Sequence, residues 1–250
     1  MSMLNSVYVA WQSPDTRDWH VVGNLQERES GYVFNYTKGA LCSQKFTPFS
    51  GMNDVHKTYV SEELFPLFKN RLLSPRRPEY PHFIKWLGLT SDEANPIEVL
   101  GRSGGMRSTD QLQVFKRIET DDNGNFEHYF FAHGLNYLCE SANKRVSELK
   151  VGDTLRLCID SQNLYDDFAV IIRADKPAEI LGYCPRYFAK DVKLMLIENP
   201  KSIQLTVETI SDDAPVNYRL LCKLSGAMSE VSIQQMSEQE EFQPISLTSA

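Results

Sequence analysis

Short apolar runs separated by turn residues dominate the first part of the chain. Residues 7–11, 21–25 and 32–36 are the clearest of these runs. The third run alternates, so its three aromatic side chains share one face, as in a half-buried strand. The pattern therefore predicts a small N-terminal β-sheet.

The pattern becomes helical between residues 64 and 73, where apolar residues recur at helical spacing after a serine and two acids. A second helix is predicted over residues 81–89. Residues 90–110 are rich in Gly, Ser and Asp, which favours a flexible linker around Gly104. We therefore place a domain boundary near residue 108.

The second part alternates short strands with Gly- and Asp-rich turns. The segment 121–125 reads Asp-Asp-Asn-Gly-Asn, a strong hairpin signal, and one longer helix is predicted over residues 186–196. The remaining predicted elements are strands at residues 112–118, 128–131, 155–159, 168–172, 179–183, 203–210 and 218–224. The expected fold class is mainly β (α+β): a small, closed or nearly closed β-barrel with one main helix, plus an N-terminal sheet with helices.

The last stretch differs from both parts. From residue 229 onward it carries acids, no basic residue and few large apolar side chains, which indicates a mobile tail. The predicted organisation is an N-terminal α+β domain at 1–107, a β-barrel domain at 108–228 and an acidic flexible tail at 229–250.

Composition limits the possible ligands and locations. The formal net charge is -7, so a nucleic-acid site would have to be a local basic patch. The five cysteines are scattered, odd in number and without a C-x-x-C pair, which indicates neither a disulfide framework nor a zinc site. We expect reduced thiols in a cytoplasmic protein, with no membrane association and no cofactor.

The stretch 163–169 combines three useful groups in front of an apolar strand. The ring of Tyr165 could stack on a base, the carboxylate of Asp166 could accept a hydrogen bond from a sugar hydroxyl, and Asn163 adds an amide. The same residues also fit an Asx-type turn with a half-buried tyrosine. On the residues alone, both interpretations stay open.

A second candidate is the densest cluster of cations and rings in the chain. Interleaved cations and rings can hold single strands, and they are equally typical of a solvated helix face with an anchored tryptophan. The cluster comprises Arg71, Arg76, Arg77, Tyr80, His82, Lys85 and Trp86.

Four ordered motifs in the second part resemble the HIRAN domain over roughly residues 112–224. They are Phe-Ala-His-Gly-Leu-Asn-Tyr at 131–137, Val-Gly-Asp-Thr-Leu-Arg-Leu at 151–157, Asn-Leu-Tyr-Asp at 163–166 and Leu-Gly-Tyr-Cys-Pro-Arg at 181–186. That family occurs at the N-terminus of certain fork-remodelling DNA helicases and as free-standing bacterial proteins. The resemblance implies an oligonucleotide-binding-like barrel that grips the free 3′ end of single-stranded DNA, in a setting of DNA repair or defence.

The resemblance also implies residue roles. Tyr137 would stack on the terminal base, Asp166 would accept from the 3′-hydroxyl and Arg186 would meet a phosphate. The full predicted DNA-binding set is Asn136, Tyr137, Asn163, Tyr165, Asp166, Tyr183 and Arg186. Leu164 stands where the family commonly has proline, which removes a fixed φ but leaves the chemistry unchanged.

The first part more weakly resembles the small N-terminal subdomain of HipA-type toxin kinases, over roughly residues 5–90. The similarity lies at residues 22–23, 32–36, 46–49 and 64–73. No phosphate-loop glycine motif and no kinase catalytic set follow, so the resemblance implies a docking or regulatory domain for a protein partner.

We therefore expect a non-enzymatic protein that binds single-stranded nucleic acid. The alternative is a protein-interaction or antitoxin-like regulatory subunit without direct DNA binding. An enzyme acting on nucleic acid would need a carboxylate cluster for metal ions, of which Asp166 and Asp167 are only a fragment. If the acidic tail covers the basic site, deleting residues 229–250 should tighten DNA binding.

Overall fold

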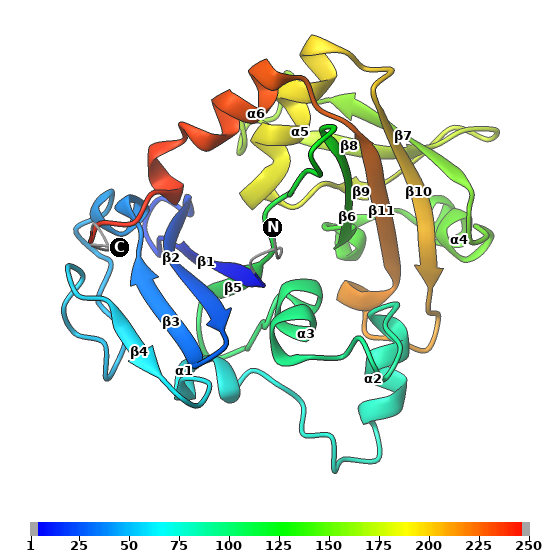
Figure 1. Ribbon diagram of the computed structural model, residues 1–250. Coiled ribbons are helices and arrows are strands. Elements are labelled where there is room, and N and C mark those ends of the chain that lie inside the picture. The colour runs from blue at the N-terminus through cyan, green and yellow to red at the C-terminus, as the bar shows by residue number, and fades with distance from the viewer. Residues whose placement is uncertain (1–4, 247–250) are drawn as a thin grey trace. The chain divides into compact units, whose positions relative to one another are not determined.

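The computed structural model describes residues 5–246. The chain folds into two compact units, each described here by itself (Figure 1). Unit 1 contains the residues up to 81, residues 91–117 and the residues from 239 onward. Unit 2 contains residues 82–90 and 118–238. Of the predicted N-terminal domain and tail, residues 1–4 and 247–250 lie outside the described residues.

Unit 1 is built on an antiparallel sheet with the strand order β4-β3-β2-β1-β5. The sheet confirms the three predicted N-terminal strands, adds one short strand, and includes the strand predicted at residues 112–118, which was expected to open the second domain. Its strands are β1 (Ser6–Gln12), β2 (Trp19–Arg28), β3 (Gly31–Tyr36), β4 (Tyr59–Ser61) and β5 (Leu112–Phe115).

The core of unit 1 is rich in aromatic rings. Phe34 and Tyr36 are fully buried, and their rings meet edge to face at a centroid distance of 5.0 Å. The buried hydroxyl of Tyr36 donates to the Met52 carbonyl at 2.8 Å and accepts from the Phe49 amide at 2.7 Å. Because both hydrogen bonds reach the segment after β3, the ring fixes that loop against the sheet.

The predicted linker around residue 104 is instead part of unit 1. Residues Pro96–Ser103 form helix α3, which begins where the side chain of Asn95 accepts from the Glu98 amide at 2.9 Å. Gly104 ends the helix with a φ of 75°. Strand β5 then pairs with β1, so the predicted boundary near 108 falls inside unit 1. The glycines that suggested a linker are the signal of a helix end.

The other helical segments of unit 1 are short. The predicted helix at 64–73 is reduced to α1 (Pro66–Lys69), which has a proline in its first turn. A 3-10 turn, η1 (Lys38–Leu41), follows β3. Helix α2 (Tyr80–Trp86) lies where the chain passes from unit 1 to unit 2.

The C-terminal segment is ordered over its described residues, in contrast to the predicted mobile tail. Helix α6 (Glu230–Ser237) is followed by the 3-10 turn η4 (Glu240–Phe242), which belongs to unit 1. There the Lys38 amide donates to the carbonyl of residue 243 at 2.8 Å, and the Ile245 amide donates to Tyr36 at 2.9 Å. These backbone bonds hold an otherwise polar segment against the N-terminal sheet.

Unit 2 is built on a second antiparallel sheet, with the strand order β6-β11-β10-β7-β8-β9. The predicted turn before β6 is present: the Asp121 carboxylate accepts from the amides of Asn123 and Asn125 at 2.9 and 2.8 Å. The strands are β6 (Asn125–Phe131), β7 (Thr154–Ile159), β8 (Val170–Ala174), β9 (Glu179–Tyr183), β10 (Ile203–Ile210) and β11 (Leu220–Ala227).

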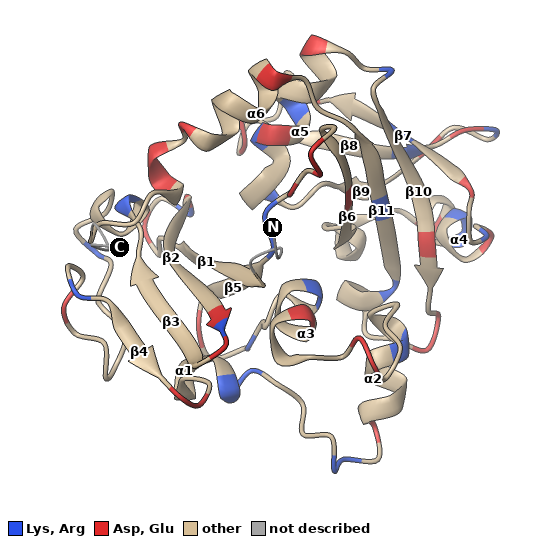
Figure 2. Ribbon diagram, in the orientation of Figure 1, with Lys and Arg blue, Asp and Glu red and all other residues tan. Residues whose placement is uncertain are grey.

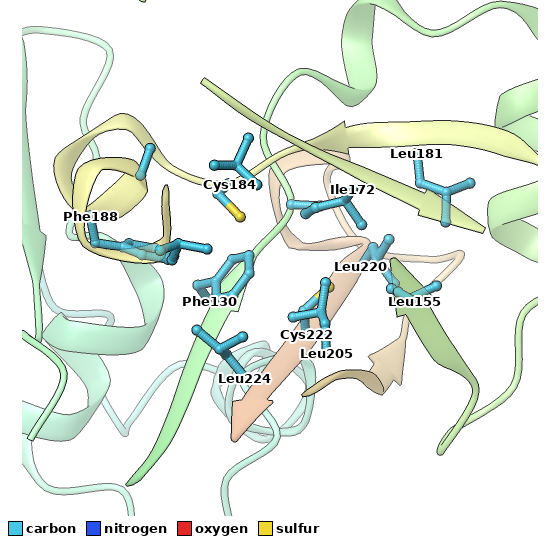
Figure 3. Close-up of a cluster of buried hydrophobic side chains, with 14 of the residues drawn as sticks. Phe130, Leu155, Ile172, Leu181, Cys184, Phe188, Leu205, Leu220, Cys222 and Leu224 are labelled. Carbon is cyan, nitrogen blue, oxygen red and sulfur yellow. The ribbon is translucent and has the colours of Figure 1, made fainter. Parts of the chain in front are cut away.

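The core of unit 2 lies between this sheet and helix α5 (Arg186–Glu198), which inserts its buried Phe188, Val192 and Met195 side chains. Phe130 meets the Phe188 ring at 4.8 Å (Figure 3). Leu155, Ile172, Leu181, Cys184, Leu205, Leu220, Cys222 and Leu224 complete the part of the core drawn there. The smaller helical segments are η2 (Leu135–Tyr137), α4 (Glu140–Ser147) and η3 (Val216–Tyr218).

The two edges of the unit 2 sheet approach each other at one point. His133, just beyond β6, exchanges two backbone hydrogen bonds of 2.9 Å with Tyr183 at the end of β9. A closed barrel needs a longer ladder at this junction, so the barrel itself stays a prediction, whereas the mainly β architecture is confirmed. None of the helices within residues 5–246 has both the length and the apolar character that a membrane span requires.

Candidate nucleic-acid interface

The loop between β7 and β8 is fixed by its own polar side chains. The Asn163 carbonyl oxygen accepts from the amides of Tyr165 and Asp166 at 3.0 and 3.1 Å, and Asp166 Oδ1 accepts from the Phe168 amide at 2.9 Å. The Asx-type turn is therefore present. The ring that it carries is not half-buried, however: Tyr165 is 84% exposed. The turn presents an aromatic face to solvent.

The start of helix α5 is tied to this loop by a cation. Arg186 Nε lies 3.3 Å from Asp166 Oδ2, and the guanidinium group also donates to the Tyr165 carbonyl. Pro185 is the N-cap residue of the helix, and its carbonyl accepts from the Ala189 amide at 3.0 Å. The predicted phosphate partner and the predicted hydroxyl acceptor thus contact each other, which keeps the 15% exposed acid charge-compensated.

Asp160, an acid that is absent from the predicted set, also belongs to this loop. Asp160 Oδ2 accepts from the Tyr183 hydroxyl at 3.2 Å and from the side-chain nitrogen Nδ2 of Asn163 at 2.9 Å. Burial, together with the hydrogen bond to Asp160 and its negative charge, raises the pKa of Tyr183. The tyrosine therefore stays a donor at neutral pH. The signal for Asp160 was its place directly after β7, at the start of the turn.

The segment after β6 is joined to the end of β9 by backbone hydrogen bonds. The two bonds between His133 and Tyr183 are possible because residue 182 is glycine, with a φ of 135°: a Cβ there would come within 2.5 Å of the His133 carbonyl oxygen. Burial lowers the pKa of His133 to about 4, so the ring is neutral. Asn136 and Tyr137 follow within a few residues, and Tyr137 is 93% exposed.

The structure therefore joins most of the predicted residues by direct contacts. Asn163, Tyr165, Asp166, Tyr183 and Arg186 form one hydrogen-bonded set, drawn from the β7–β8 loop, the end of β9 and the start of α5. Asn136 and Tyr137 are linked to that set only through the backbone pair of His133 and Tyr183.

Further along α5, two lysines that sequence reasoning missed contact the same loop. The Nζ atoms of Lys190 and Lys193 lie 5.6 and 5.5 Å from the centroid of the Phe168 ring. Lys193 also donates to the Asp167 carbonyl at 2.6 Å. Phe168 is 40% exposed, so the ring and both cations border solvent. Their signal was the helical spacing of the two lysines from Arg186.

The second sequence candidate, the cluster between residues 71 and 86, is not assembled in this way. The Arg71 side chain is only 2% exposed; it donates to the Gly105 carbonyl at 2.7 Å and pairs with Asp110 at 2.5 Å. Its role is structural within unit 1. Trp86, in unit 2, donates from its indole nitrogen to Asp213 at 3.4 Å.

A comparison with models of protein families shows which family this segment resembles. The family model of the HIRAN domain matches residues 125–229. This segment is a HIRAN domain. The match includes every strand and helix that supplies the candidate interface, and it confirms the corresponding prediction. The HipA-type resemblance of the first part stays a prediction.

Two solved structures show a looser similarity. One is a protein from Lactobacillus plantarum, 20% identical, with 42% of this chain and 100% of that chain covered and a TM-score of 0.32. The other is the HIRAN domain of human HLTF, 15% identical, with 48% and 92% covered and a TM-score of 0.34. Similarity at this level says nothing about individual residues. No curated protein matches the chain.

Proposed function

We propose that the HIRAN domain binds single-stranded nucleic acid at the loop between β7 and β8, with a preference for a free 3′ end. The observation that carries the proposal is the hydrogen-bonded set of Asn163, Asp166, Tyr183 and Arg186 around the exposed Tyr165. The second exposed ring, Tyr137, follows His133, whose backbone pairs with Tyr183. A charge-compensated acid beside exposed aromatic faces suits a strand terminus, which offers a base and a hydroxyl group.

The two rings would supply most of the binding free energy. Tyr137 and Tyr165 are 93% and 84% exposed, so a base can cover them without displacing protein contacts. Stacking of one base on an aromatic side chain contributes about 1–3 kcal/mol. Arg186 holds the backbone carbonyl of Tyr165, which limits the motion of the ring that would be covered.

The preference for a 3′-hydroxyl would come from Asp166. Its two oxygens accept from the Phe168 amide and pair with Arg186, and each carboxylate oxygen can accept more than one hydrogen bond. A hydroxyl could therefore donate to it. A 3′-phosphate would instead bring negative charge against the carboxylate, which costs free energy.

Fluorescence anisotropy with labelled dT8, carrying either a 3′-hydroxyl or a 3′-phosphate, tests the proposal. Tyr137→Ala and Tyr165→Ala should each weaken binding of the hydroxyl oligonucleotide by about tenfold, the loss of one stacked base. Tyr129→Ala is the matched control, because Tyr129 lies on β6 beside Lys223, outside the candidate interface.

Asp166→Asn should reduce the preference for the 3′-hydroxyl, because the amide no longer repels a phosphate. Asp175→Asn, which alters an acid paired with Arg156 at 3.0 Å, is its control. Equal affinity of the unmodified protein for both ends would remove the 3′-end claim. Absence of binding to any single strand would remove the proposed function.

Docking of a protein partner by unit 1 stays a prediction, and nothing in the geometry of its described residues selects one kind of partner.

A further inference from the structure

A row of three cations lies along one side of helix α5. Arg186, Lys190 and Lys193 follow the spacing i, i+4, i+7, which places side chains above one another on a single helix face. All three contact the β7–β8 loop: Arg186 through Asp166 and Tyr165, Lys193 through the Asp167 carbonyl, and both lysines through Phe168. We call these three cations the α5 strip.

From this arrangement we infer that the α5 strip is a phosphate-binding track, which holds the sugar–phosphate backbone of the nucleotides that precede the bound terminus. The inference rests on the proposed function and extends it. It assigns Lys190, Lys193 and Phe168 to nucleic-acid binding, and it implies a ligand of several nucleotides rather than a single terminal one.

The length of the strip fits such a ligand. Seven residues of α-helix rise by about 10 Å, and a stacked strand rises by about 3.4 Å per nucleotide. The strip therefore spans roughly three nucleotides. It begins at Arg186, beside Tyr165, so a strand whose last base stacks on that ring can continue along α5.

The basic side chains are concentrated on α5 even though the chain as a whole is acidic. The β7–β8 loop carries three carboxylates opposite the three cations, but two of them are already engaged within the site. Asp160 accepts from Tyr183 and Asn163, and Asp166 is paired with Arg186, which leaves Asp167 as the remaining acid of the loop. Figure 2 shows both basic and acidic positions on α5, and the acid that lies between the two strip lysines in the sequence, Asp191, is only 2% exposed. The strip is the kind of local basic patch that the net charge of -7 requires of any nucleic-acid site.

Phe168 gives the strip a second function. Its ring is 40% exposed and lies under both lysine ammonium groups, which holds the two long side chains over the loop. Lysines restrained in this way lose less rotamer freedom when they meet a phosphate than freely moving ones would. The same ring edge offers apolar contact to a sugar.

The test measures how affinity depends on strand length and salt, with the whole 250-residue chain. Labelled dT2, dT4 and dT8 are titrated with the unmodified protein, with the double variant Lys190→Gln/Lys193→Gln, and with the control Lys144→Gln/Lys201→Gln. The control removes the same charge from exposed positions on α4 and after α5, away from the loop. Glutamine retains much of each side chain, so the fold should be kept.

The expected result is a loss that grows with length. The strip variant should bind dT8 about tenfold more weakly than the unmodified protein, with a smaller loss for dT2. Its salt dependence should be shallower by about 1.4, since each phosphate contact on a single strand contributes about 0.7 to the slope of log affinity against log salt. The control should change neither quantity by as much, and rU8 should show the same loss as dT8 because the phosphates are shared.

Several outcomes would overturn the inference. Equal losses in the strip variant and the control would show a long-range field instead of a track. Unchanged affinity of the strip variant, with the preference for a 3′-hydroxyl intact, would remove the track and leave the proposed function standing. Equal displacement of dT8 by hexaglutamate would show a general acidic-ligand site. Failure of the unmodified protein to bind any strand would remove both proposals.

Discussion

Two guanidinium–carboxylate pairs, one in each unit, share their chemistry and differ in their surroundings. Arg71 pairs with Asp110 at 2.5 Å and donates to a backbone carbonyl; Arg186 pairs with Asp166 at 3.3 Å and does the same. The Arg71 side chain is 2% exposed, whereas that of Arg186 is 32% exposed. The two acids show the reverse order, with Asp110 31% and Asp166 15% exposed. The Arg71 guanidinium is thus enclosed within unit 1, whereas that of Arg186 reaches the surface beside the exposed ring of Tyr165. Exposure of the neighbours, more than the pair itself, separates a structural site from a binding site.

Substitution of the two arginines should affect different properties: the stability of unit 1 for Arg71 and oligonucleotide binding for Arg186. Arg71→Ala leaves the Gly105 carbonyl and the 31% exposed Asp110 carboxylate without their partner, and should lower the free energy of unfolding of unit 1 by about 2 kcal/mol. Arg186→Ala should cost about 1 kcal/mol or less in stability, and weaken oligonucleotide binding by about tenfold. Denaturant unfolding followed by tryptophan fluorescence measures the first effect, since Trp11 and Trp19 lie in unit 1 and Trp86 lies in unit 2.

The comparison would fail if the two substitutions destabilised the chain equally, or if Arg71→Ala alone abolished binding while its stability was unchanged. Arg156→Ala, which also breaks a surface pair with an aspartate, provides the matched control for Arg186→Ala.

A substitution in the C-terminal segment should, like Arg71→Ala, affect the stability of unit 1. Phe242 is 6% exposed, meets the Tyr8 ring at 5.1 Å and lies 3.9 Å from the Arg117 guanidinium. Phe242→Ala should therefore lower the stability of unit 1 by roughly 3 kcal/mol, at the low end for a buried phenylalanine. Val231→Ala, at a 59% exposed position on α6, should have little effect.

Oligonucleotide affinity should be unchanged by Phe242→Ala at temperatures where the protein stays folded. Tighter binding after removal of residues 229–250 would instead support the covering role expected from the acidic composition. Thermal unfolding and anisotropy on the same samples separate the two outcomes.

The smallest expected effect concerns an ion pair of intermediate exposure in unit 1. Glu98 contacts Arg102 at 2.9 Å and also pairs with Lys116. Burial opposes ionisation of Glu98, but the hydrogen bonds and charges of the two cations outweigh it and lower the pKa of the carboxyl below its ordinary value of 4.5. A lowered pKa stabilises the folded state above pH 4.5, and this contribution is lost as pH falls through the folded-state value.

Acid unfolding of Glu98→Gln should therefore depend less steeply on pH below about 4.5 than that of the unmodified protein. Glu63→Gln, which alters an 81% exposed acid paired with Lys69, is the control. Identical acid profiles for all three proteins would contradict the assignment.

The sequence predicted the polar groups of the β7–β8 turn better than the residues that contact this turn from other elements. Asn163 and Asp166 act through local turns, whose geometry depends on residues two or three positions away, and such turns are readable from sequence. Lys190 and Phe168 become part of the site only when the β7–β8 loop lies against α5, and Asp160 joins it through Tyr183 at the end of β9. Both contacts join residues more than 20 positions apart, so the position of Asp160 after a strand and the spacing of the lysines on a helix did not reveal the partners of these residues.

The division into domains was harder to predict for the same reason. The strand expected to open the second domain, β5, pairs instead with β1, about a hundred residues earlier in the chain. The acidic composition after residue 229 concealed a few apolar anchors, Met236 and Phe242 among them. A low average hydrophobicity cannot reveal two well-placed side chains.

The return of residues 239–246 to the N-terminal sheet has a consequence for how the chain matures during synthesis. A ribosome releases β1, β2 and β3 first, yet the Ile245 amide that pairs with Tyr36 emerges after the whole HIRAN domain has left the exit tunnel. Domains fold as units while synthesis proceeds. The half of the protein that is made first is thus the half that is finished last, and until then an aromatic-rich sheet must wait for its final segment.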